Sequence, residues 1–299
     1  MSYVVIGGTG TLGSEIMRQL LQRDPGTKIT CYSRDEMKQY QARAEFPSVR
    51  FVIGDIRDRA AVKNVVRGAH TVFHFAALKH IDTCEANPVE AIKTNLQGSL
   101  NIADAAAAAQ VPYVVYSNTD KAVLPITTYG YTKALAQNVL LEMNKGTRTK
   151  FSVFNWGNVL ASRGSVIQCF VRSLLDSGQV NITDLRMTRF WLRIEDAATL
   201  VLERYKTAPN DRAVIPPCKG AYVTDVAQAC ARLLGIKKFR TNVTGLRGTE
   251  KLYEVLESTH GGCLRSDTCA QYTADELDSL LRDIVTRLAQ EHKAGRASA

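Results

Sequence analysis

The chain begins with an apolar run at residues 2–6 that ends in a glycine-rich turn, after which apolar residues recur at helical spacing. A strand, a glycine turn and a helix in this order are typical of a dinucleotide-binding unit, because glycine lets the backbone turn tightly beside a pyrophosphate. The following helix N-terminus supplies N–H groups and the positive end of a dipole. The residues of this turn that we expect to bind the cofactor are Gly7, Thr9, Gly10, Thr11, Leu12 and Gly13. The alternative is an ordinary tight turn between a strand and a helix.

Strand-like apolar runs continue to alternate with helical patterns along the first half of the chain. They fall at residues 28–32, 49–53, 71–75, 114–116 and 150–154. Short connections and near-continuous apolar strands indicate a parallel sheet covered by helices on both faces. We therefore expect an α/β fold, a Rossmann-type doubly wound sheet formed by residues 1–160, to which residues 190–215 return. Residues 161–189 and 216–293 would form a smaller C-terminal substrate-binding lobe, and residues 294–299 a disordered tail.

Local signals predict several helix boundaries. Asn87 and Pro88 suit the start of a helix, which we expect to run to about Gln110. Asp58 is placed to cap the helix that follows the third strand. Thr273 with Glu276 forms a capping box for a final helix.

The residues after the second strand decide which dinucleotide is preferred. An NAD site usually has an acidic residue at this position, which binds the ribose hydroxyls. Here Ser33 and Arg34 offer a hydroxyl and a guanidinium fork suited to a phosphate. The sequence therefore favours NADP, while Asp35 leaves NAD open. A solvated loop charge is the alternative for Arg34.

Two further strand ends predict contacts with the cofactor. Asp55 follows the third strand, where its carboxylate can accept a hydrogen bond from the adenine amino group. Ala76 and Ala77 follow the fourth strand, and their small side chains would let a cofactor lie close to the strand ends. Lys79 then projects near the same crevice. Ligands bind at this carboxyl edge of a doubly wound sheet.

Composition excludes several classes of protein. The net charge is +9, but Lys and Arg are spread along the chain, so we expect no nucleic-acid partner and attribute the surplus to anionic nucleotide ligands. The seven cysteines never form Cys-x-x-Cys and the five histidines lack ligand spacing, which predicts reduced thiols and no metal site. No apolar run approaches the ~18 residues needed to span a bilayer, and the first residues lack a signal-peptide pattern. We expect a soluble, cytoplasmic protein with no membrane partner.

The stretch from Asn118 to Lys133 carries four proton-handling side chains after the fifth strand. Asp120 and Lys121 are adjacent, and Tyr129 and Lys133 are four residues apart at the start of a predicted helix. That spacing puts tyrosine and lysine on one helical face. An ammonium there can stabilise a phenolate and lower its pKa. Tyr129 would then be usable as a base.

With these motifs placed, the chain resembles the extended short-chain dehydrogenase/reductases, and more narrowly the UDP-N-acetylglucosamine 4,6-dehydratases of bacterial polysaccharide and flagellin-glycan pathways. The matching motifs span roughly residues 3–256 in family order. They are Gly7-Gly8-Thr9-Gly10, Tyr32-Ser33-Arg34-Asp35-Glu36, Ala76-Ala77-Leu78-Lys79-His80, Ile92-Lys93-Thr94-Asn95, Thr119-Asp120-Lys121-Ala122-Val123, Gly157-Asn158-Val159-Leu160, Ser162-Arg163-Gly164-Ser165-Val166-Ile167, Met187-Thr188-Arg189-Phe190 and Glu250-Lys251-Leu252. Thr-Asp-Lys ahead of the tyrosine is the specific element, because epimerases and ordinary reductases lack the Asp-Lys pair.

The resemblance implies a role for each of the four groups. Tyr129, assisted by Lys133, would be the base for oxidation at C4 of the hexose. Lys121 would take the C5 proton and Asp120 would give a proton to the hydroxyl that leaves C6. Lys121 must be neutral and Asp120 protonated for these roles, which burial and neighbouring charges can bring about. Tyr129 stands where the retaining branch is expected to carry methionine, which favours inversion at C5.

The resemblance also implies the ligand contacts. Further cofactor contacts would come from Ile56, Thr119 and Val159, besides Tyr129 and Lys133. The UDP-sugar would be bound by Lys79, Tyr129, Asn158, Arg163, Ser165, Arg189, Arg247 and Glu250. Each charged residue of that set has an alternative as a surface or turn residue. A homo-oligomer, either a dimer or a hexamer, is implied as well.

Some positions depart from the family pattern, and other functions stay open. Asn118 stands where the family usually has serine, and Asn155 where it often has arginine. We interpret Trp156 and Trp191 as core aromatics rather than as uracil platforms. The alternative functions are a nucleotide-sugar 4-epimerase or 4-keto reductase, and a non-enzymatic NADP-sensing protein of the same fold.

Overall fold

The computed structural model describes residues 1–160, 164–257 and 263–297, which divide into two units. Unit 1 contains Met1–Trp156, Glu195–Pro216 and, of a third segment, the described residue Glu257. Unit 2 contains Gly157–Ile194, Pro217–Leu256 and residues 263–297. The chain thus leaves unit 1 after Trp156 and returns at Glu195, where the sequence predicts 160 and 190.

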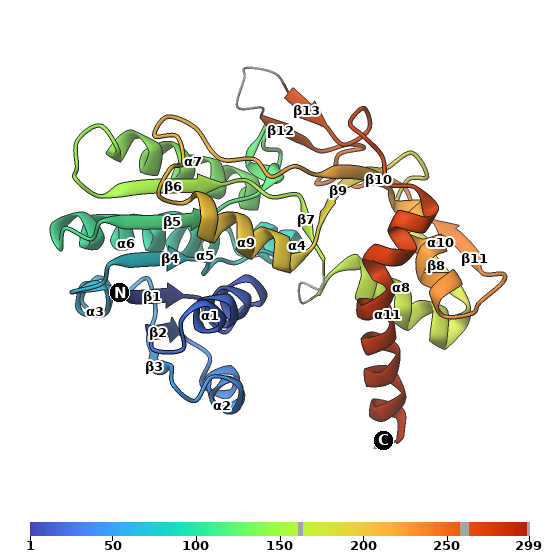
Figure 1. Cartoon of the computed structure of the whole chain (residues 1–299). Helices are drawn as coiled ribbons and strands as arrows, with labels where there is room; N and C mark the ends of the chain where they lie inside the picture. The colour runs from blue at the N-terminus through green and yellow to red at the C-terminus, as the bar shows by residue number, and fades with distance from the viewer. Residues whose placement is uncertain (161–163, 258–262, 298–299) are drawn as a thin grey trace. The chain divides into compact units, whose positions relative to one another are not determined.

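Unit 1 is built on a six-stranded sheet in which every pair of neighbouring strands is parallel (Figure 1). The strand order is β3-β2-β1-β4-β5-β6. The strands are β1 (Ser2–Ile6), β2 (Lys28–Ser33), β3 (Arg50–Ile53), β4 (Thr71–His74), β5 (Tyr113–Ser117) and β6 (Lys150–Phe154). The order reverses between β1 and β4, which places a ligand crevice at the carboxyl ends of those strands. The predicted doubly wound parallel sheet is confirmed.

Helices cover both faces of this sheet because alternate strand residues point to opposite sides. Val4 and Ile6 of β1 pack with α3 (Arg59–Val66), α6 (Gly98–Ala108) and α7 (Thr128–Met143). Figure 1 shows α1 (Thr11–Arg23) and α9 (Ile194–Arg204) on the opposite face of the sheet. The remaining helices of this unit include α2 (Glu36–Glu45) and α4 (Ile81–Ala86).

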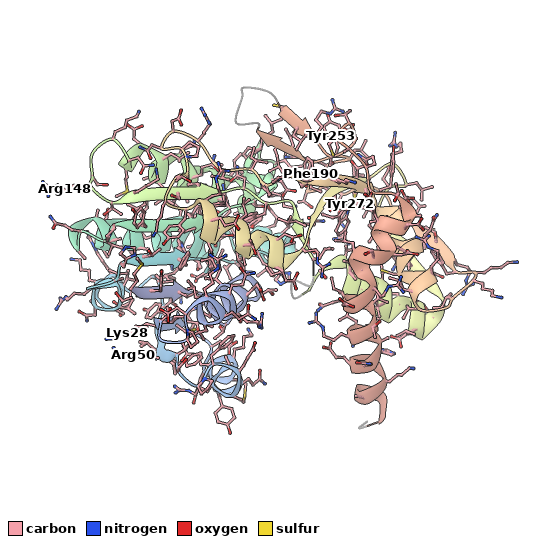
Figure 2. The ribbon with its side chains drawn as sticks, viewed as in Figure 1. Lys28, Arg50, Arg148, Phe190, Tyr253 and Tyr272 are labelled. Carbon is pink, nitrogen blue, oxygen red and sulfur yellow. The ribbon has the colours of Figure 1, made fainter. Side chains whose placement is uncertain are left out.

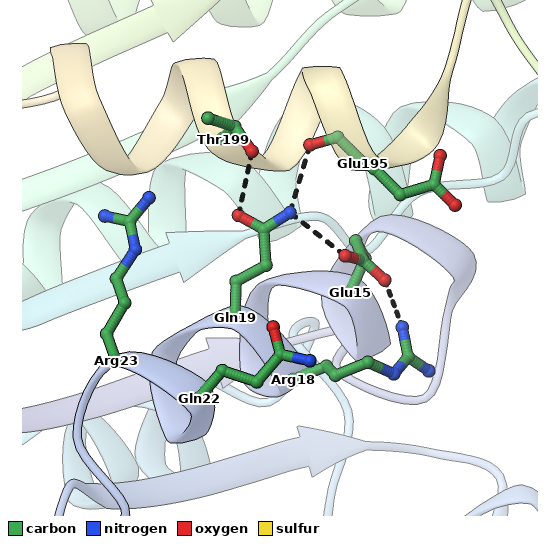
Figure 3. A pocket seen from close by; sticks show the side chains of 7 residues that line it. All are labelled: Glu15, Arg18, Gln19, Gln22, Arg23, Glu195 and Thr199. Atoms are coloured by element: carbon green, nitrogen blue, oxygen red, sulfur yellow. Dashed lines mark hydrogen bonds and ion pairs between the residues drawn. The ribbon is translucent and has the colours of Figure 1, made fainter.

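The side chain of Gln19 in α1 bonds to α9, a helix from the second half of the chain (Figure 3). Its amide nitrogen donates to the Glu195 carbonyl at 3.0 Å and to the Glu15 carboxylate at 3.0 Å. Its amide oxygen accepts from the Thr199 hydroxyl at 3.1 Å. The polar cleft between the two helices in Figure 3 is lined by none of the predicted site residues, so we assign these contacts to folding.

The capping predictions are confirmed. Asp58 accepts from the N–H groups of Ala60 and Ala61 at the start of α3. Thr273 and Glu276 bond reciprocally at 2.9 and 3.3 Å before α11 (Ala274–Ala297).

The single long helix predicted from Pro88 to Gln110 is wrong in detail. It consists of α5 (Pro88–Ala91), a π-helix at Ile92–Gln97 and α6, which ends at Ala108. The wider turn lets the buried Asn95 side chain bond to the backbone of Leu78 instead of facing solvent. Such π-turns frequently occur at functional sites.

In its described residues, unit 2 combines small sheets with three helices around its own apolar core. One sheet has the order β10-β9-β7, and β8 pairs with β11. Tyr272, labelled in Figure 2, donates its hydroxyl to the Trp191 carbonyl at 3.2 Å. The elements are β7 (Asn158–Val159), α8 (Val166–Ser177), β8 (Gln179–Ile182), β9 (Thr188–Leu192), β10 (Lys219–Tyr222), α10 (Val223–Leu233), β11 (Arg240–Val243), β12 (Val255–Glu257), β13 (Cys263–Arg265) and α11.

The predicted disordered tail is wrong for residues 294–297, which continue α11. The sequence of this segment, Ala-Gly-Arg-Ala, contains no proline that would end the helix earlier. Residues 298–299 lie outside the described part of the chain. Across the described residues, no helix has the length and apolar character needed to cross a membrane.

Candidate active site

The predicted catalytic and cofactor residues of unit 1 lie at or after the carboxyl ends of its strands. Lys28 and Arg50 mark the opposite, amino ends of β2 and β3 (Figure 2). The glycine turn follows β1 and Ser117 ends β5. This is the edge where parallel sheets bind ligands.

The glycine turn is shaped by close backbone contacts that exclude larger residues. Gly7 has φ +81°, and a Cβ there would lie 2.7 Å from the backbone nitrogen of Ala76. A Cβ on Gly13 would lie 2.5 Å from the Gly7 carbonyl oxygen. Glycine is therefore required at both positions, and the turn lies directly against the residue that follows β4.

The start of α1 is suited to bind an anion. Gly10 is its N-cap, and no side chain among the described residues caps it. The first backbone N–H groups of the helix, at Thr11, Leu12 and Gly13, therefore have no side-chain acceptor. Thr9 is buried beside them. A pyrophosphate oxygen is the kind of acceptor that this arrangement fits, and the glycine turn leaves backbone space for it.

Asp35 and Arg34, which follow β2, differ in their contacts: Asp35 caps a helix, and Arg34 is a partly exposed cation. Asp35 caps α2: its Oδ1 accepts from the Lys38 N–H at 2.9 Å, and its Oδ2 lies 2.7 Å from the Lys38 ammonium. The Ser33 hydroxyl accepts from Gln39 at 3.0 Å. The Arg34 side chain is half exposed and lies 3.7 Å from Asp55.

Asp55 is held by its neighbour Arg57. Although partial burial opposes it, hydrogen bonds from Arg57 hold the pKa of this carboxylate below its usual value. The guanidinium donates twice to Oδ2, at 2.9 and 2.6 Å. Ile56 is buried, and a Cβ on Gly98 would lie 2.6 Å from its side chain. The predicted adenine contact of Asp55 stays a prediction.

Asp120 and Lys121 lie on a short 3-10 turn, Asp120–Ala122, that follows β5. The Asp120 side chain is fully buried, and its Oδ1 accepts from the Lys121 ammonium at 3.0 Å and from the Thr119 hydroxyl at 3.0 Å. Its other oxygen, Oδ2, is buried without a hydrogen-bond partner among the described residues. The Lys121 side chain is 23% exposed. The pair thus has one buried oxygen without a hydrogen-bond partner among the described residues and one partly exposed amine.

The N-terminus of α7 is capped twice, which fixes the turn that carries Tyr129. The Thr127 hydroxyl accepts from the Gly130 N–H at 3.0 Å. Glu85 of α4 accepts from both the backbone N–H and the hydroxyl of Thr128, at 2.6 and 3.1 Å. A Cβ on Gly130 would lie 2.4 Å from the Lys121 carbonyl oxygen, so α7 and the Asp120–Ala122 turn are in direct contact.

Lys133 is buried beneath this turn of α7. Its ammonium donates to the Ser117 carbonyl at 2.6 Å and lies 3.9 Å from the centre of the Tyr116 ring. Burial lowers the pKa of Lys133 to about 7. Its amine can therefore change protonation state near neutral pH.

The Tyr129 phenol is affected mainly by burial and by Lys121 and Thr119, and the predicted assistance from Lys133 stays a prediction. Burial raises the pKa of Tyr129 to about 12, and the groups that oppose this rise are the charge on Lys121 and the hydrogen bond with Thr119. The Lys133 ammonium contacts the Ser117 carbonyl and the Tyr116 ring, whereas the charge of Lys121 acts to lower the pKa of Tyr129. The two predicted pairs are therefore electrostatically linked rather than independent.

Asn95 and Ser117 contribute to this site although the sequence analysis assigned them no role. Asn95 holds both the N–H and the carbonyl of Leu78, at 2.8 and 2.9 Å, and donates to the Thr132 hydroxyl at 3.3 Å. Ser117 holds Lys133. An asparagine among the apolar residues of a predicted helix could have indicated Asn95. The role of Ser117 depends on its backbone carbonyl, which every residue has, so no sequence pattern indicates it. Lys79 is exposed in the loop that Asn95 holds.

Unit 2 contains most of the predicted sugar-nucleotide residues. Asn158 and Val159 form β7 and pair with Trp191 and Leu192 of β9. Ser165 precedes α8, and its hydroxyl oxygen is buried without a hydrogen-bond partner among the described residues. Arg163 lies outside the described residues.

Arg189 and the Arg247–Glu250 turn also belong to unit 2. Arg189 is buried: its guanidinium donates to the carbonyls of Thr188 and Leu252, at 2.7 and 3.3 Å, and lies 3.8 Å from Glu254. Arg247 is exposed, and its N–H donates to the Glu250 carboxylate at 3.3 Å. Their contacts with a ligand stay predictions.

Comparison with known proteins agrees with this geometry. The chain is 37% identical over 263 residues to a UDP-N-acetylglucosamine 4,6-dehydratase (inverting) of Campylobacter jejuni, covering 86% of this chain and 77% of that protein. It is 35% identical over 264 residues to a UDP-glucose 4-epimerase of Rickettsia bellii, with the same coverage of 86% and 77%.

A solved structure shares the fold. DesIV, a dTDP-glucose 4,6-dehydratase of Streptomyces venezuelae solved with NAD and TYD bound, matches with a TM-score of 0.78 at 22% identity, over 98% of each chain. The family described as "Polysaccharide biosynthesis protein" matches residues 3–274. The resemblance predicted from the motifs is confirmed: the chain belongs to the polysaccharide biosynthesis protein family and is an extended short-chain dehydrogenase/reductase.

Proposed function

We propose that this protein is a hydro-lyase that converts a UDP-N-acetylhexosamine to its UDP-4-keto-6-deoxy sugar with inversion at C5. The substrate that we propose is UDP-N-acetylglucosamine. The observation that carries the proposal is the Asp120–Lys121 ion pair of 3.0 Å, whose lysine charge acts on the Tyr129 phenol. A C4 oxidation alone needs only a base at the phenol; a second acid–base pair beside it suits an elimination.

The glycine turn and the uncapped start of α1 fit a dinucleotide, which Gly7, Gly10 and Gly13 would hold through backbone contacts. When bound, the nicotinamide would supply the hydride chemistry, an oxidation at C4 and a reduction at C6. Tyr129 takes the C4 hydroxyl proton. Burial raises the pKa of Tyr129 to about 12, so this pKa must fall if the phenol is to act as a base. We assign that lowering to Lys121 and Thr119, because both act to lower the pKa of Tyr129.

Oxidation at C4 makes the C5 proton acidic, and the second pair then completes the loss of water. A proton shift from the Lys121 ammonium to Asp120 within the 3.0 Å pair would leave the lysine neutral and the aspartic acid protonated. The neutral, partly exposed amine of Lys121 then accepts the C5 proton. Asp120 gives its proton to the hydroxyl that leaves C6 as water, and its Oδ2, which has no hydrogen-bond partner among the described residues, is the oxygen suited to carry that proton. Return of the hydride to C6 requires that a proton be added to C5, from the face opposite the one that lost it if C5 is inverted. The proton that Tyr129 took from the C4 hydroxyl balances this addition, so the net change would be the loss of water with no change in the cofactor.

We propose NADP as the preferred cofactor. Asp35 caps α2 and pairs with Lys38, so the carboxylate that would bind ribose hydroxyls in an NAD site is engaged elsewhere. The half-exposed Arg34 guanidinium remains as the group for a 2′-phosphate.

We also propose a cytoplasmic homo-oligomer, either a dimer or a hexamer. Leu135 and Val139 lie on one face of α7, four residues apart, and are 53% and 39% exposed. Burial of such a face against a second copy would stabilise an assembly. Light scattering of the purified protein tests this point, and a monomer at all concentrations would contradict it.

A 4-epimerase is the second candidate, favoured by the 35% identity to the Rickettsia bellii protein. The Asp120–Lys121 pair argues against it, because inversion at C4 needs no elimination base. A non-enzymatic NADP sensor is disfavoured by the intact Tyr129 and Lys133.

The deciding experiment is incubation with UDP-N-acetylglucosamine and catalytic NADP, followed by proton NMR in deuterated water. We expect a 4-keto-6-deoxy sugar with deuterium at C5, in the inverted configuration, and no net accumulation of NADPH. Simple C4 inversion, or net consumption of added NADPH, would refute the dehydratase assignment.

A further inference from the structure

Trp156 is the last residue of unit 1 before the chain enters unit 2, and it lies buried two residues after β6. Its ring stacks on Phe154, with centroids 5.5 Å apart and planes inclined by 14°. A tryptophan in such a place is expected to be a packing residue whose indole N–H finds any nearby acceptor. Its actual partners indicate more.

Both polar groups of Trp156 bond to the segment that carries the two acid–base pairs. Its backbone carbonyl accepts from the Asp120 N–H at 2.7 Å. Its indole Nε1 donates to the Ser117 hydroxyl at 2.9 Å. The carbonyl of the same Ser117 accepts from the Lys133 ammonium at 2.6 Å. Trp156 is thus linked to Asp120 by one hydrogen bond, and to Lys133 by two hydrogen bonds through Ser117.

We propose that Trp156 is a positioning residue for this active site: its indole N–H holds the end of β5 so that the Ser117 carbonyl keeps Lys133 in place, and its carbonyl holds Asp120. This inference rests on the proposed function for its kinetic test. The indole donor is needed for the first task, because a phenylalanine could stack on Phe154 but could not hold the serine hydroxyl.

The stacked ring also matters for the second task. A carbonyl is present whatever the side chain, but its direction depends on how the residue is packed. The ring between Phe154 and the end of β5 sets that direction. Trp156→Leu should therefore disturb Asp120 as well as Ser117, whereas Trp156→Phe should disturb Ser117 alone.

The test is a double-mutant cycle between Trp156→Phe and Ser117→Ala. Misplacement of reacting groups by less than an ångström costs about tenfold to a hundredfold in rate, so we expect kcat of each single variant to fall by about tenfold or more, with KM for the UDP-sugar changed by less than about threefold. Because both changes break the same hydrogen bond, the double variant should be no slower than the slower single variant.

Trp191→Phe is the matched control. Trp191 is also buried, and its indole N–H lies 3.5 Å from the Ala221 carbonyl in unit 2. We expect its kcat to equal that of the unchanged protein. If Trp156→Phe lowers only the melting temperature, or if the losses from Trp156→Phe and Ser117→Ala simply multiply, Trp156 is a packing residue and the inference is wrong.

Cofactor binding separates this inference from the proposed function. NADPH fluorescence titration needs no turnover, and loss of the Lys133 position should weaken binding by about threefold to tenfold in Trp156→Phe, but not in Trp191→Phe. If the unchanged protein makes no 4-keto sugar, the proposed function fails, while the titration still tests Trp156. Equal NADPH affinity in all three proteins would overturn the positioning role.

Discussion

The two pairs of proton-handling residues lie on different kinds of structure. Tyr129 and Lys133 belong to α7, are buried, and are fixed by helix caps from Thr127 and Glu85. Asp120 and Lys121 lie on a 3-10 turn, where the aspartate is buried but the lysine side chain is 23% exposed. One pair is buried in unit 1; the other has a group that is partly exposed.

This difference separates two tasks that need different amounts of freedom. Hydride transfer depends on fixed geometry, which a buried helix provides. Removal of the C5 proton from the sugar requires an amine that can approach C5, take up the proton and later release it. A partly exposed lysine fits this requirement. In the proposed mechanism Lys121 would act on both tasks, because its charge opposes the raised pKa of Tyr129.

Removing the tyrosine hydroxyl should have the largest effect. Tyr129→Phe deletes the base for C4 oxidation, and we expect turnover to fall by about 10²- to 10⁴-fold, because no later step can start. NMR of product formation measures this loss. Tyr131→Phe, on the same helix and 54% exposed, is the control and should retain full activity. A Tyr129 variant with more than a tenth of the activity would remove the phenol from the mechanism.

Lys121→Met should stop the elimination but spare part of the oxidation. We expect product formation to fall by about 10²-fold or more, while single-turnover reduction of bound NADP, followed by absorbance, remains detectable. Lys145→Met is the control, since its side chain is 75% exposed and paired only with Glu142 among the described residues. Equal loss of both steps would show that the two pairs do not divide the work.

Burial of titratable groups in unit 1 should also make the stability of the protein depend on pH. Burial, with a smaller effect of the Lys133 charge, lowers the pKa of His74 from 6.5 to about 3. Between these values the unfolded chain binds more protons than the folded one, so stability falls as pH drops below 6.5. The loss due to this group is about 2 kcal/mol on going from about pH 7 to about pH 5.

Urea unfolding at both pH values measures this loss, and His74→Gln should remove that part of the pH dependence. The ring nitrogen Nε2 lies 2.9 Å from the Ser99 hydroxyl, so the variant itself costs some stability at every pH. The difference between the two pH values is therefore the quantity to compare. An identical pH dependence in both proteins would contradict a buried neutral histidine.

Arg34→Ala should have the smallest effect and should touch neither pair. We expect NADP affinity to fall by about tenfold, because a charge-assisted contact with the 2′-phosphate is lost, with NAD affinity and kcat at saturating cofactor unchanged. Isothermal titration with each dinucleotide measures this. Arg23→Ala, at the exposed end of α1, is the control. Unchanged NADP affinity in Arg34→Ala would point to NAD.

Sequence reasoning predicted the features that depend on neighbours along the chain. The strands of unit 1, the glycine turn, the Asp58 cap and the Thr273–Glu276 capping box follow from local patterns. The π-helix could not be predicted, because it accompanies bonds from Asn95 to Leu78, 17 residues earlier. The role of Trp156 was missed for the same reason, since its indole bonds to a serine 39 residues away.

By itself the sequence determined the order of strands and helices, the places where only glycine fits, and the four side chains able to move protons. These depend on backbone preferences and on residue chemistry, which are local. Only the tertiary structure decided that Lys133 contacts the Ser117 carbonyl, that the charge of Lys121 acts on Tyr129, and that one Asp120 oxygen has no hydrogen-bond partner among the described residues. Burial and charge set these properties, and both come from groups that folding brings together from distant parts of the chain.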